Sequence, residues 1–509
     1  MANGVARQLY IISDLHLGGV YPQSGDPEDR GFRICTQGER VAELVEAVAA
    51  KPAGAPRIEL VINGDAVDFL AEREEAPPYW SAFTADSAAA VKKLEAIVAR
   101  DRRLFDAFGR LLENGHRLTL LLGNHDIELA LPQVRRRLKE LIGVEGRHDF
   151  EFIHDGEAYA VGDVLIEHGN RYDSFNVVTQ DALRRIRSLA SRNQPVPAQY
   201  AFDPPAGSKM VAAVINPIKD AYRFVDLLKP ETGAVVPMLL ALEPGYRSIL
   251  SQVATLALAA SKHRLAAPAL PCFGGDISSE VSALDGFGGD MSGASFGSDI
   301  SSGGAVGNDP LDRILAEALG ESPGAFLAAL EPEPASYAAA AIGEDISTFA
   351  GVDSTLGLVQ LLLSRKSASV ERRLPALLKA LRALQSDQSF DPGVETASEY
   401  LNAARDLSKG GFRCVVFGHT HMAKKIELGG GAWYLNSGTW ADLIQFPVEL
   451  LAGPEPEALK QVAQFVDDMQ GGRLKRWIRF KPTYVRIDLD GDDRMTAAEL
   501  CDYTGPEGV

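Results

Sequence analysis

Cysteine is scarce in this chain of 509 residues. None of the cysteines belongs to a Cys-x-x-Cys pair, and long stretches of sequence separate them. A disulfide framework and a zinc knuckle both need paired or closely spaced cysteines, so neither is expected. We expect a cytoplasmic location, because reduced cysteines suit that compartment and Met1 to Tyr10 lacks the pattern of a signal peptide. The four cysteines are Cys35, Cys272, Cys414 and Cys501.

Long apolar runs are also missing. The most apolar internal stretch, Gly233 to Ala260, contains two prolines, a glutamate and an arginine. A membrane-spanning helix needs about 20 predominantly apolar residues in a row, so we expect no transmembrane segment. Peripheral contact with a membrane stays open. The interrupting residues are Pro237, Glu243, Pro244 and Arg247.

Basic residues are fewer than acidic ones. The chain has 51 Lys and Arg against 69 Asp and Glu, which gives a formal net charge of -18. A phosphate backbone is repelled at long range by such a protein, so we expect no specific nucleic-acid partner.

The remaining composition is that of a globular protein. Hydrophobic residues make up 46% of the chain and charged residues 24%, which allows a sizeable core. The length exceeds what one hydrophobic core usually serves, so two or three structural units are expected, with one able to interrupt another.

Strand and helix patterns alternate in the first third of the chain. Short β-branched runs at Leu9 to Ser13, Ile58 to Ile62 and Leu118 to Leu122 each end in a polar loop. Helical spacing occupies Glu39 to Ala50 and Ala88 to Leu112. This alternation predicts a layered α/β fold, in which functional loops gather at one edge of the sheet.

The strand pattern returns late in the chain, and a region of different character separates the two parts. Residues 173–409 are rich in Ala and Leu with helical spacing, as in Leu356 to Leu363 and Leu374 to Leu384. We therefore expect a core whose first part is 1–172 and second part 410–509, with a helical insertion or cap at 173–409. The late strands are predicted at Arg413 to Phe417, Lys424 to Leu428, Ala432 to Leu435 and Tyr484 to Leu489.

One segment of the insertion, residues 273–308, is dominated by Gly, Ser and Asp. Such composition is typical of a flexible linker or a surface loop. Calcium binding by Asp276, Asp290 and Asp299 is the alternative, although their uneven spacing fits no known calcium loop.

Polar clusters that combine Asp, Asn and His follow the apolar runs. Carboxylate and amide oxygens together with imidazole nitrogens suit Mn, Fe or Zn. An Asp-x-His or His-x-His step places both side chains on one side of an extended segment, so such a set can hold two ions. The clusters are Asp14-Leu15-His16, Gly64-Asp65 with Asp68, Gly123-Asn124-His125-Asp126, His168-Gly169-Asn170 and Gly418-His419-Thr420-His421.

In type and order, these clusters closely resemble the motifs of the calcineurin-like metallophosphoesterase superfamily. The resemblance implies a layered core, in which helices flank a central β-sandwich, with a large and mainly helical insertion. It also implies two divalent cations, of Mn, Fe or Zn. One cation would be bound by Asp14, His16 and His421, the other by Asn124, His168 and His419, and Asp65 would bridge them.

The resemblance further implies hydrolysis of a phosphomonoester, phosphodiester or pyrophosphate by metal-bound hydroxide. Two cations about 3.5 to 4 Å apart can lower the pKa of a bridging water and neutralise charge on the phosphoryl oxygens. His125 is then expected to act on the leaving oxygen as a general acid or electrostatic clamp, with Asp126 orienting its ring. Asp68 is expected to be a support residue. The segment Asn436 to Thr439 also resembles a superfamily segment that supports the metal loops.

Substrate contacts are expected from Asn124, from His125 and from Arg171, whose guanidinium could bind two phosphate oxygens. A surface salt bridge is the alternative for Arg171. The expected substrate is a phosphate-containing small molecule or a lipid-linked one.

The branch of the superfamily is less clearly indicated. Phosphoprotein phosphatases carry Gly-Asp-x-Val-Asp-Arg-Gly, where this chain has Phe69 and Leu70 in place of the last two residues. The layout is more similar to that of bacterial UDP-2,3-diacylglucosamine pyrophosphate hydrolases, whose helical lid occupies the same interval. Those enzymes have Gly-Asn-Arg-Asp and His-Gly-Asp where this chain has Gly-Asn-His-Asp and His-Gly-Asn.

Three alternatives stay open at this point. One is a phosphoprotein phosphatase. Another is a catalytically silent scaffold of the same fold that binds partner proteins through its insertion. The third, a DNA nuclease, shares the Gly-Asn-His-Asp block but fits poorly with the acidic balance.

Overall fold

The computed structural model describes residues 5–20, 31–54, 56–74, 80–246, 352–364 and 369–509. The Gly-, Ser- and Asp-rich segment 273–308 lies outside these ranges, and so do the linker and calcium interpretations attached to it.

The larger sheet has six strands in the order β13-β12-β1-β2-β3-β4. Strands β1 to β4 run parallel, while β12 is antiparallel to β1 and β13 to β12. The strands predicted near the start of the chain are therefore confirmed as neighbours. Their bounds are Arg7–Ile12 (β1), Arg57–Asn63 (β2), Arg117–Leu121 (β3), Phe150–Ile153 (β4), Thr483–Leu489 (β12) and Met495–Asp502 (β13).

The second sheet has five strands in the order β5-β6-β8-β10-β9. Its central strands β6, β8 and β10 are parallel, and antiparallel strands β5 and β9 form the edges. Three of the late predicted strands are confirmed here. The bounds are Tyr159–Val161 (β5), Val164–Ile166 (β6), Cys414–Phe417 (β8), Lys424–Gly429 (β9) and Ala432–Asn436 (β10).

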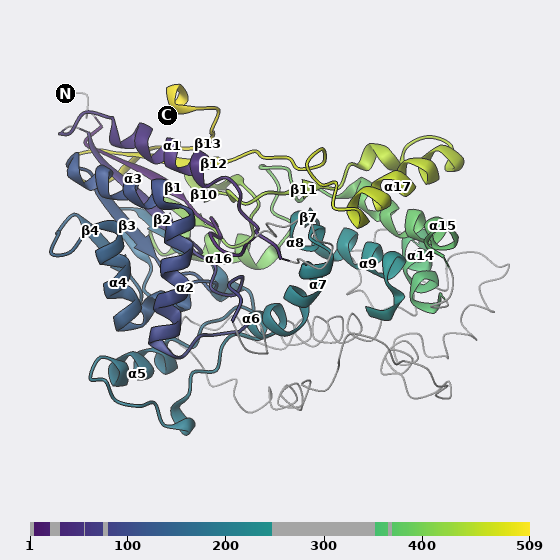
Figure 1. Cartoon of the computed structure of the whole chain (residues 1–509). Helices are drawn as coiled ribbons and strands as arrows, with labels where there is room; N and C mark the ends of the chain where they lie inside the picture. The colour runs from purple at the N-terminus through teal and green to yellow at the C-terminus, as the bar shows by residue number, and fades with distance from the viewer. Residues whose placement is uncertain (1–4, 21–30, 55, 75–79, 247–351, 365–368) are drawn as a thin grey trace.

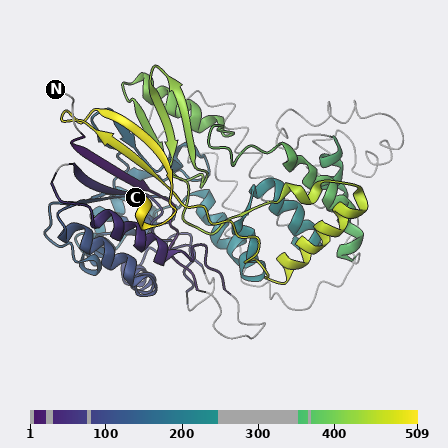
Figure 2. The same cartoon turned by 90° about the horizontal axis from the view of Figure 1, so that it is seen from above.

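The two sheets lie side by side (Figure 2), and one hydrophobic cluster joins residues from both of them. Leu9 and Ile11 of β1 point into it, together with Val416 of β8. The alternate residues of β1, Tyr10 and Ile12, point to the opposite face, where they join a larger cluster with helices. Because successive side chains of a strand point to opposite faces, this continuous apolar run buries β1 on both faces.

Helices cover the outer faces of both sheets (Figures 1 and 2). Apolar residues of α1 to α4 pack on the six-stranded sheet, and those of α16 pack on the five-stranded sheet. The protein is therefore a mixed α/β structure with several sheets, as expected from the sequence. The helix bounds are Gly38–Ala49 (α1), Ser87–Arg100 (α2), Arg102–Glu113 (α3), Pro132–Ile142 (α4), Gln180–Ala190 (α5) and Ser398–Lys409 (α16).

The helical spacing predicted from Ala88 to Leu112 is confirmed, but it forms two helices and not one. Two helices, α2 and α3, meet at Asp101, whose backbone is not helical (φ -114°, ψ 33°). The Asp101 carboxylate accepts two hydrogen bonds from the Arg33 guanidinium, at 2.5 and 2.6 Å. Apolar spacing continues across the break, so periodicity alone could not reveal it.

A separate body of helices lies beside the sheets, on the right in Figure 1. Its hydrophobic cluster joins α9, α14, α15 and α17, and it includes Leu451, Phe465 and Leu474 from beyond position 410. The cluster therefore contains residues from both sides of the boundary predicted between positions 409 and 410. The predicted domain boundaries stay predictions. The bounds are Ala206–Met210 (α6), Asn216–Ala221 (α7), Phe224–Leu227 (α8), Val236–Leu242 (α9), Val352–Leu363 (α14), Val370–Leu381 (α15) and Glu455–Gln470 (α17).

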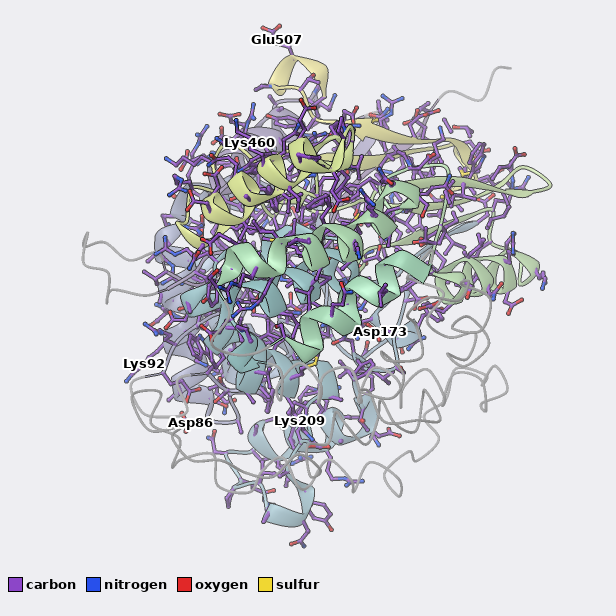
Figure 3. The ribbon with its side chains drawn as sticks, turned by 90° about the vertical axis from the view of Figure 1, so that its right-hand side faces the viewer. Asp86, Lys92, Asp173, Lys209, Lys460 and Glu507 are labelled. Carbon is purple, nitrogen blue, oxygen red and sulfur yellow. The ribbon has the colours of Figure 1, made fainter. Side chains whose placement is uncertain are left out.

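The helical body, hereafter α6 to α9 with α14, α15 and α17, is tied to the rest of the chain by contacts between segments far apart in the sequence. Strand β7 (Leu228–Lys229) pairs in parallel with β11 (Ile444–Gln445). Asn216 donates a hydrogen bond from its amide to the carbonyl oxygen of Leu70, 2.7 Å away. Figure 3 views the protein from this side and labels Lys460 on α17. Across the part of the chain that the structure covers, no helix has the length and hydropathy needed to cross a bilayer.

A buried lysine holds the segment 387–397, which leads from the helical body to α16. Lys424 is 1% exposed, and its ammonium donates to the carbonyl oxygens of Ser389, Asp391 and Val394 at 2.6, 2.9 and 2.6 Å. The three backbone acceptors would lack this donor if the ammonium were absent, and buried acceptors without donors are costly.

We expect Lys424→Met to lower the free energy of unfolding by about 1.5–3 kcal/mol, the range for hydrogen bonds to a charged group. Urea denaturation measures this directly. The matched control is Lys425→Met, because Lys425 lies nearer the surface and pairs with Glu499, so its loss should cost less than about 1 kcal/mol. Equal costs for the two variants would contradict this role of Lys424.

Candidate metal centre

The predicted ligands meet where the parallel strands of both sheets end. Asp14, Asp65 and Asn124 follow β1, β2 and β3, while His168 and His419 follow β6 and β8. Carboxyl ends of parallel strands share one edge of a sheet, so the two packed sheets bring all five loops together. Backbone hydrogen bonds then fix the loops to one another. Asp14 N donates to Gly64 O, His16 N to Asp65 O, and His419 N to both Asp14 carboxylate oxygens.

Potential ligand atoms converge in three overlapping groups. Within each group these atoms all lie within 4.8 Å of one another. Asp65 and His16 each belong to two groups, so they connect the three into one centre. The groups are Asp14 with His16 and His421, His16 with Asp65 and His125, and Asp65 with His168 and His419.

Individual distances show how tightly the donors are gathered. The Nε2 atoms of His16 and His421 are 2.9 Å apart. Nε2 of His168 lies 3.2 Å from Asp65 Oδ2 and 3.2 Å from Asn124 Oδ1. Asn124, which is a ligand by the sequence prediction, thus presents its oxygen to this centre.

The charges of the centre fit a cation. Asp14, Asp65 and Asp68 are each 0 to 1% exposed, and among the described residues their ion-pair partners are histidines, with no lysine or arginine in contact. Buried carboxylates are costly unless paired with positive charge. A divalent cation would supply that charge through donors of the correct type.

The backbone of the ligand loops is strained. Non-glycine residues seldom adopt positive φ, which costs on the order of 1–3 kcal/mol each. Such strain is typical of sites where side chains must converge. Seven non-glycine residues among those described have positive φ, and five of them are predicted ligands: Asp14 (54°), His16 (45°), Asp65 (51°), His419 (67°) and His421 (62°).

Two motif glycines leave room for ligands from other loops. A Cβ added at Gly123 would lie 2.1 Å from Asp65 Oδ1 and 2.4 Å from Asp65 N. A Cβ added at Gly64 would lie 2.3 Å from Nδ1 of His168. The glycines of Gly-Asn-His-Asp and Gly-Asp are therefore required by close packing across the centre.

The pKa values of the predicted ligands are shifted by burial and by the charges of their neighbours. Burial opposes the charged forms, yet neighbouring histidines lower the pKa of Asp65 well below its ordinary value. Burial likewise opposes protonation of His168, but Asp65 raises its pKa to about 10. Burial lowers the pKa of His421 to about 4, which favours the neutral imidazole that binds metals.

His125 is held by Asp68, so the prediction that Asp126 orients its ring is wrong. Nδ1 of His125 lies 3.1 Å from Asp68 Oδ2. The Asp126 carboxylate instead accepts from the backbone N–H groups of Ala66, at 2.9 Å, and Gly123, at 2.7 Å. Burial, followed by the charge of Asp65, raises the pKa of Asp126 to about 8. Asp126 therefore ties the loops together, since both its oxygens are used by the backbone.

Asp68 supports two histidines of the centre, as expected. The same oxygen, Oδ2, faces Nδ1 of both His16, at 3.2 Å, and His125. Burial opposes protonation of His125, but Asp68 and then Asp65 raise its pKa to about 9.

Arg171 adopts the salt-bridge arrangement that was the alternative for it. Its guanidinium lies 3.6 Å from Glu167 Oε2 and donates to the carbonyl oxygen of Gly156, 3.2 Å away. It also lines a small pocket together with His168 and Gln180. The substrate contact predicted for Arg171 thus stays a prediction.

Residues Asn436 to Thr439 support the ligand loops, as the resemblance implied. Asn436 donates to the carbonyl oxygen of Gly418 at 2.7 Å, and the Thr439 hydroxyl donates to that of Asp14 at 2.6 Å. These bonds link the loops that follow β8 and β1.

Sequence reasoning missed two polar residues beside the centre. Asp173 Oδ2 lies 3.3 Å from Nε2 of His419, and Asn176 Oδ1 accepts from the amide of Asn124 at 3.4 Å. The spacing Asn170-x-x-Asp173-x-x-Asn176 directly after His168 was the available signal.

We expect Gly123→Ala to destabilise the protein by about 1–3 kcal/mol even with metal removed, because overpacking against Asp65 forces a shift. Urea denaturation in the presence of a chelator tests this. Gly491→Ala is the control, because no atom lies within 4 Å of the added Cβ there. A Gly123→Ala variant as stable as that control would show that the loops do not pack as described.

Comparisons with known proteins add no family assignment. No protein-family model matches the chain, and no curated protein matches it. The relationship to calcineurin-like metallophosphoesterases stays a prediction from the motifs. The structure supports a coarser conclusion: the chain brings together buried histidine and aspartate groups that could hold a metal ion.

Proposed function

We propose that the chain is a metal-dependent phosphoric ester hydrolase that holds two divalent cations, related to the calcineurin-like metallophosphoesterases. The observation that carries the proposal is the set of three ligand groups, in which His16 and Asp65 each belong to two groups, at the edge where five loops from two sheets meet. A structural metal site is usually a closed set of four ligands from one or two short segments. An extended centre, in which residues are shared between ligand groups, is more typical of a catalytic site than of a structural one.

The ligand sets follow from these groups. The donors of Asp14, His16 and His421 would hold one cation. Those of Asp65, His168 and His419 would hold the other, with the Asn124 oxygen adjacent to His168. Asp65 faces His16 at 3.8 Å and His168 at 3.2 Å, so its carboxylate suits a bridging position. The mixture of oxygen and imidazole donors favours Mn, Fe or Zn.

Bound cations would supply Lewis acidity, which neutralises charge on phosphoryl oxygens and lowers the pKa of water. The chain's own contribution is to hold its donors in place before substrate arrives. Strained ligand loops and the hydrogen bonds of Ser13, Asn436 and Thr439 fix that geometry.

His125 is the group suited to proton transfer. Asp68 holds its Nδ1, which leaves Nε2 for a leaving oxygen. Its side chain is 18% exposed, compared with 19% for that of His421 and 2% for those of His16 and His168, so a substrate could reach His125. We assign it the role of general acid, or of a clamp on the phosphoryl group.

The helical body contacts a loop that is hydrogen-bonded to His125. Phe69 N donates to the carbonyl oxygen of His125 at 3.1 Å, and the next residue, Leu70, accepts from Asn216 at the start of α7. This adjacency supports a role for the helical body in selecting a phosphomonoester, phosphodiester or pyrophosphate substrate.

Mn-loaded wild-type protein should hydrolyse para-nitrophenyl phosphate or the matching bis-ester. We expect His125→Ala to reduce kcat by about 10²–10⁴-fold, the usual contribution of general acid catalysis. Asp65→Asn should reduce activity by at least about 100-fold, since even residues that only orient a ligand contribute 10–100-fold.

The controls are His148→Ala and Asp155→Asn, which make the same chemical changes at an exposed histidine and an exposed aspartate. Both should retain wild-type rates. Wild-type protein that binds Mn but hydrolyses neither ester nor a pyrophosphate would instead favour the scaffold alternative.

A further inference from the structure

A hydrogen-bonded pair of residues connects two of the predicted ligands from outside the centre. Asp173 Oδ2 accepts from the Asn176 amide at 2.8 Å and lies 3.3 Å from Nε2 of His419. The other end of the pair is the Asn176 oxygen, which accepts from the amide nitrogen of Asn124 at 3.4 Å. The pair thus touches two ligands that are more than 200 positions apart in the sequence but belong to the same proposed cation.

Each contact fixes the orientation of a ligand. With Nε2 of His419 facing Asp173, Nδ1 is the ring nitrogen left for the centre. With its amide nitrogen on Asn176, Asn124 directs its oxygen toward His168, 3.2 Å away. Carboxylate and amide partners of this kind fix the ring and tautomer of metal ligands. The third ligand, His168, is fixed separately, because its Nδ1 lies 2.8 Å from the carbonyl oxygen of Asn63.

The helical body holds the pair in place. Gly207 of α6 donates from its backbone N–H to the carbonyl oxygen of Phe175 at 2.8 Å. A Cβ added at Gly207 would lie 2.3 Å from Asn176 Oδ1, so α6 approaches this side chain as closely as a glycine allows. Asp173 is labelled in Figure 3, where the protein is seen from the side of the helical body.

The ligands of the other proposed cation have different support. His16 is oriented by Asp68, and the backbone of Asp14 is held by Thr439. Neither contact involves the segment 173–176. The two ligand sets do meet at the backbone N–H of His419, which donates to the Asp14 carboxylate. Asp173 and Asn176, however, contact the side chains of His419 and Asn124. A disturbance of this segment should therefore reach one cation and spare the other.

We propose that Asp173 and Asn176 are positioning residues for the cation bound by Asn124, His168 and His419, and that α6 sets their position through Gly207. The inference rests on the proposed two-cation centre. If Asp173 and Asn176 position these ligands, the affinity for this cation depends on how α6 is docked. The affinity for the other cation is independent of α6.

Calorimetric titration of metal-free, full-length protein with MnCl₂, combined with elemental analysis, tests the proposal. Wild-type protein should bind two ions. Asp173→Asn should weaken one of the two sites about 10–100-fold, as expected for loss of an orienting partner, and leave the other unchanged. Gly207→Ala should weaken the same site. Asp181→Asn is the matched control, because Asp181 is 86% exposed on α5.

Three results would overturn the proposal, and they are distinguishable. Wild-type protein that binds no Mn would overturn the two-cation centre itself. Two intact sites in folded Asp173→Asn would overturn only the positioning role. Equal weakening of both sites would overturn the selective link between the segment 173–176 and one cation. Circular dichroism of the metal-free variants verifies that each is folded.

Discussion

The carboxylate of Asp65 is the group on which the arrangement of the centre depends. It is 1% exposed, faces His16 and His168, and accepts the backbone N–H of His125 at 2.8 Å. A charge so buried needs positive charge close by. The loops after β1, β3 and β6 each place a nitrogen atom close to this carboxylate. Glycines and residues with positive φ allow these loops to approach so closely. The packing of the two sheets brings these loops within reach.

Much of this arrangement could be predicted from sequence because it depends on local patterns. Short β-branched apolar runs predict strands, and polar residues at strand ends meet once the strands are parallel. The strands Arg7–Ile12, Arg57–Asn63 and Arg117–Leu121 were found in this way, and so were the residues that now converge.

Other features depend on contacts between segments far apart in the chain. Asp101, at the break between α2 and α3, accepts hydrogen bonds from the distant Arg33, and the ring of His125 is held by Asp68, although Asp126 is its sequence neighbour. The pair Asp173 and Asn176 acquires its role only when α6 packs on it. No periodicity encodes such contacts, because each involves one side chain and one distant partner.

The two proposals share one physical basis, which is control of donor geometry by neighbouring side chains. Asp68, Asn436 and Thr439 hold ligand loops within the sheet region, whereas Asp173 and Asn176 connect them to the helical body. The most direct test of the central claim is anomalous diffraction from crystals grown with Mn. Two peaks are expected about 3.5–4 Å apart, on either side of the Asp65 carboxylate. The absence of anomalous density near Asp65 in crystals with Mn bound elsewhere would contradict that claim.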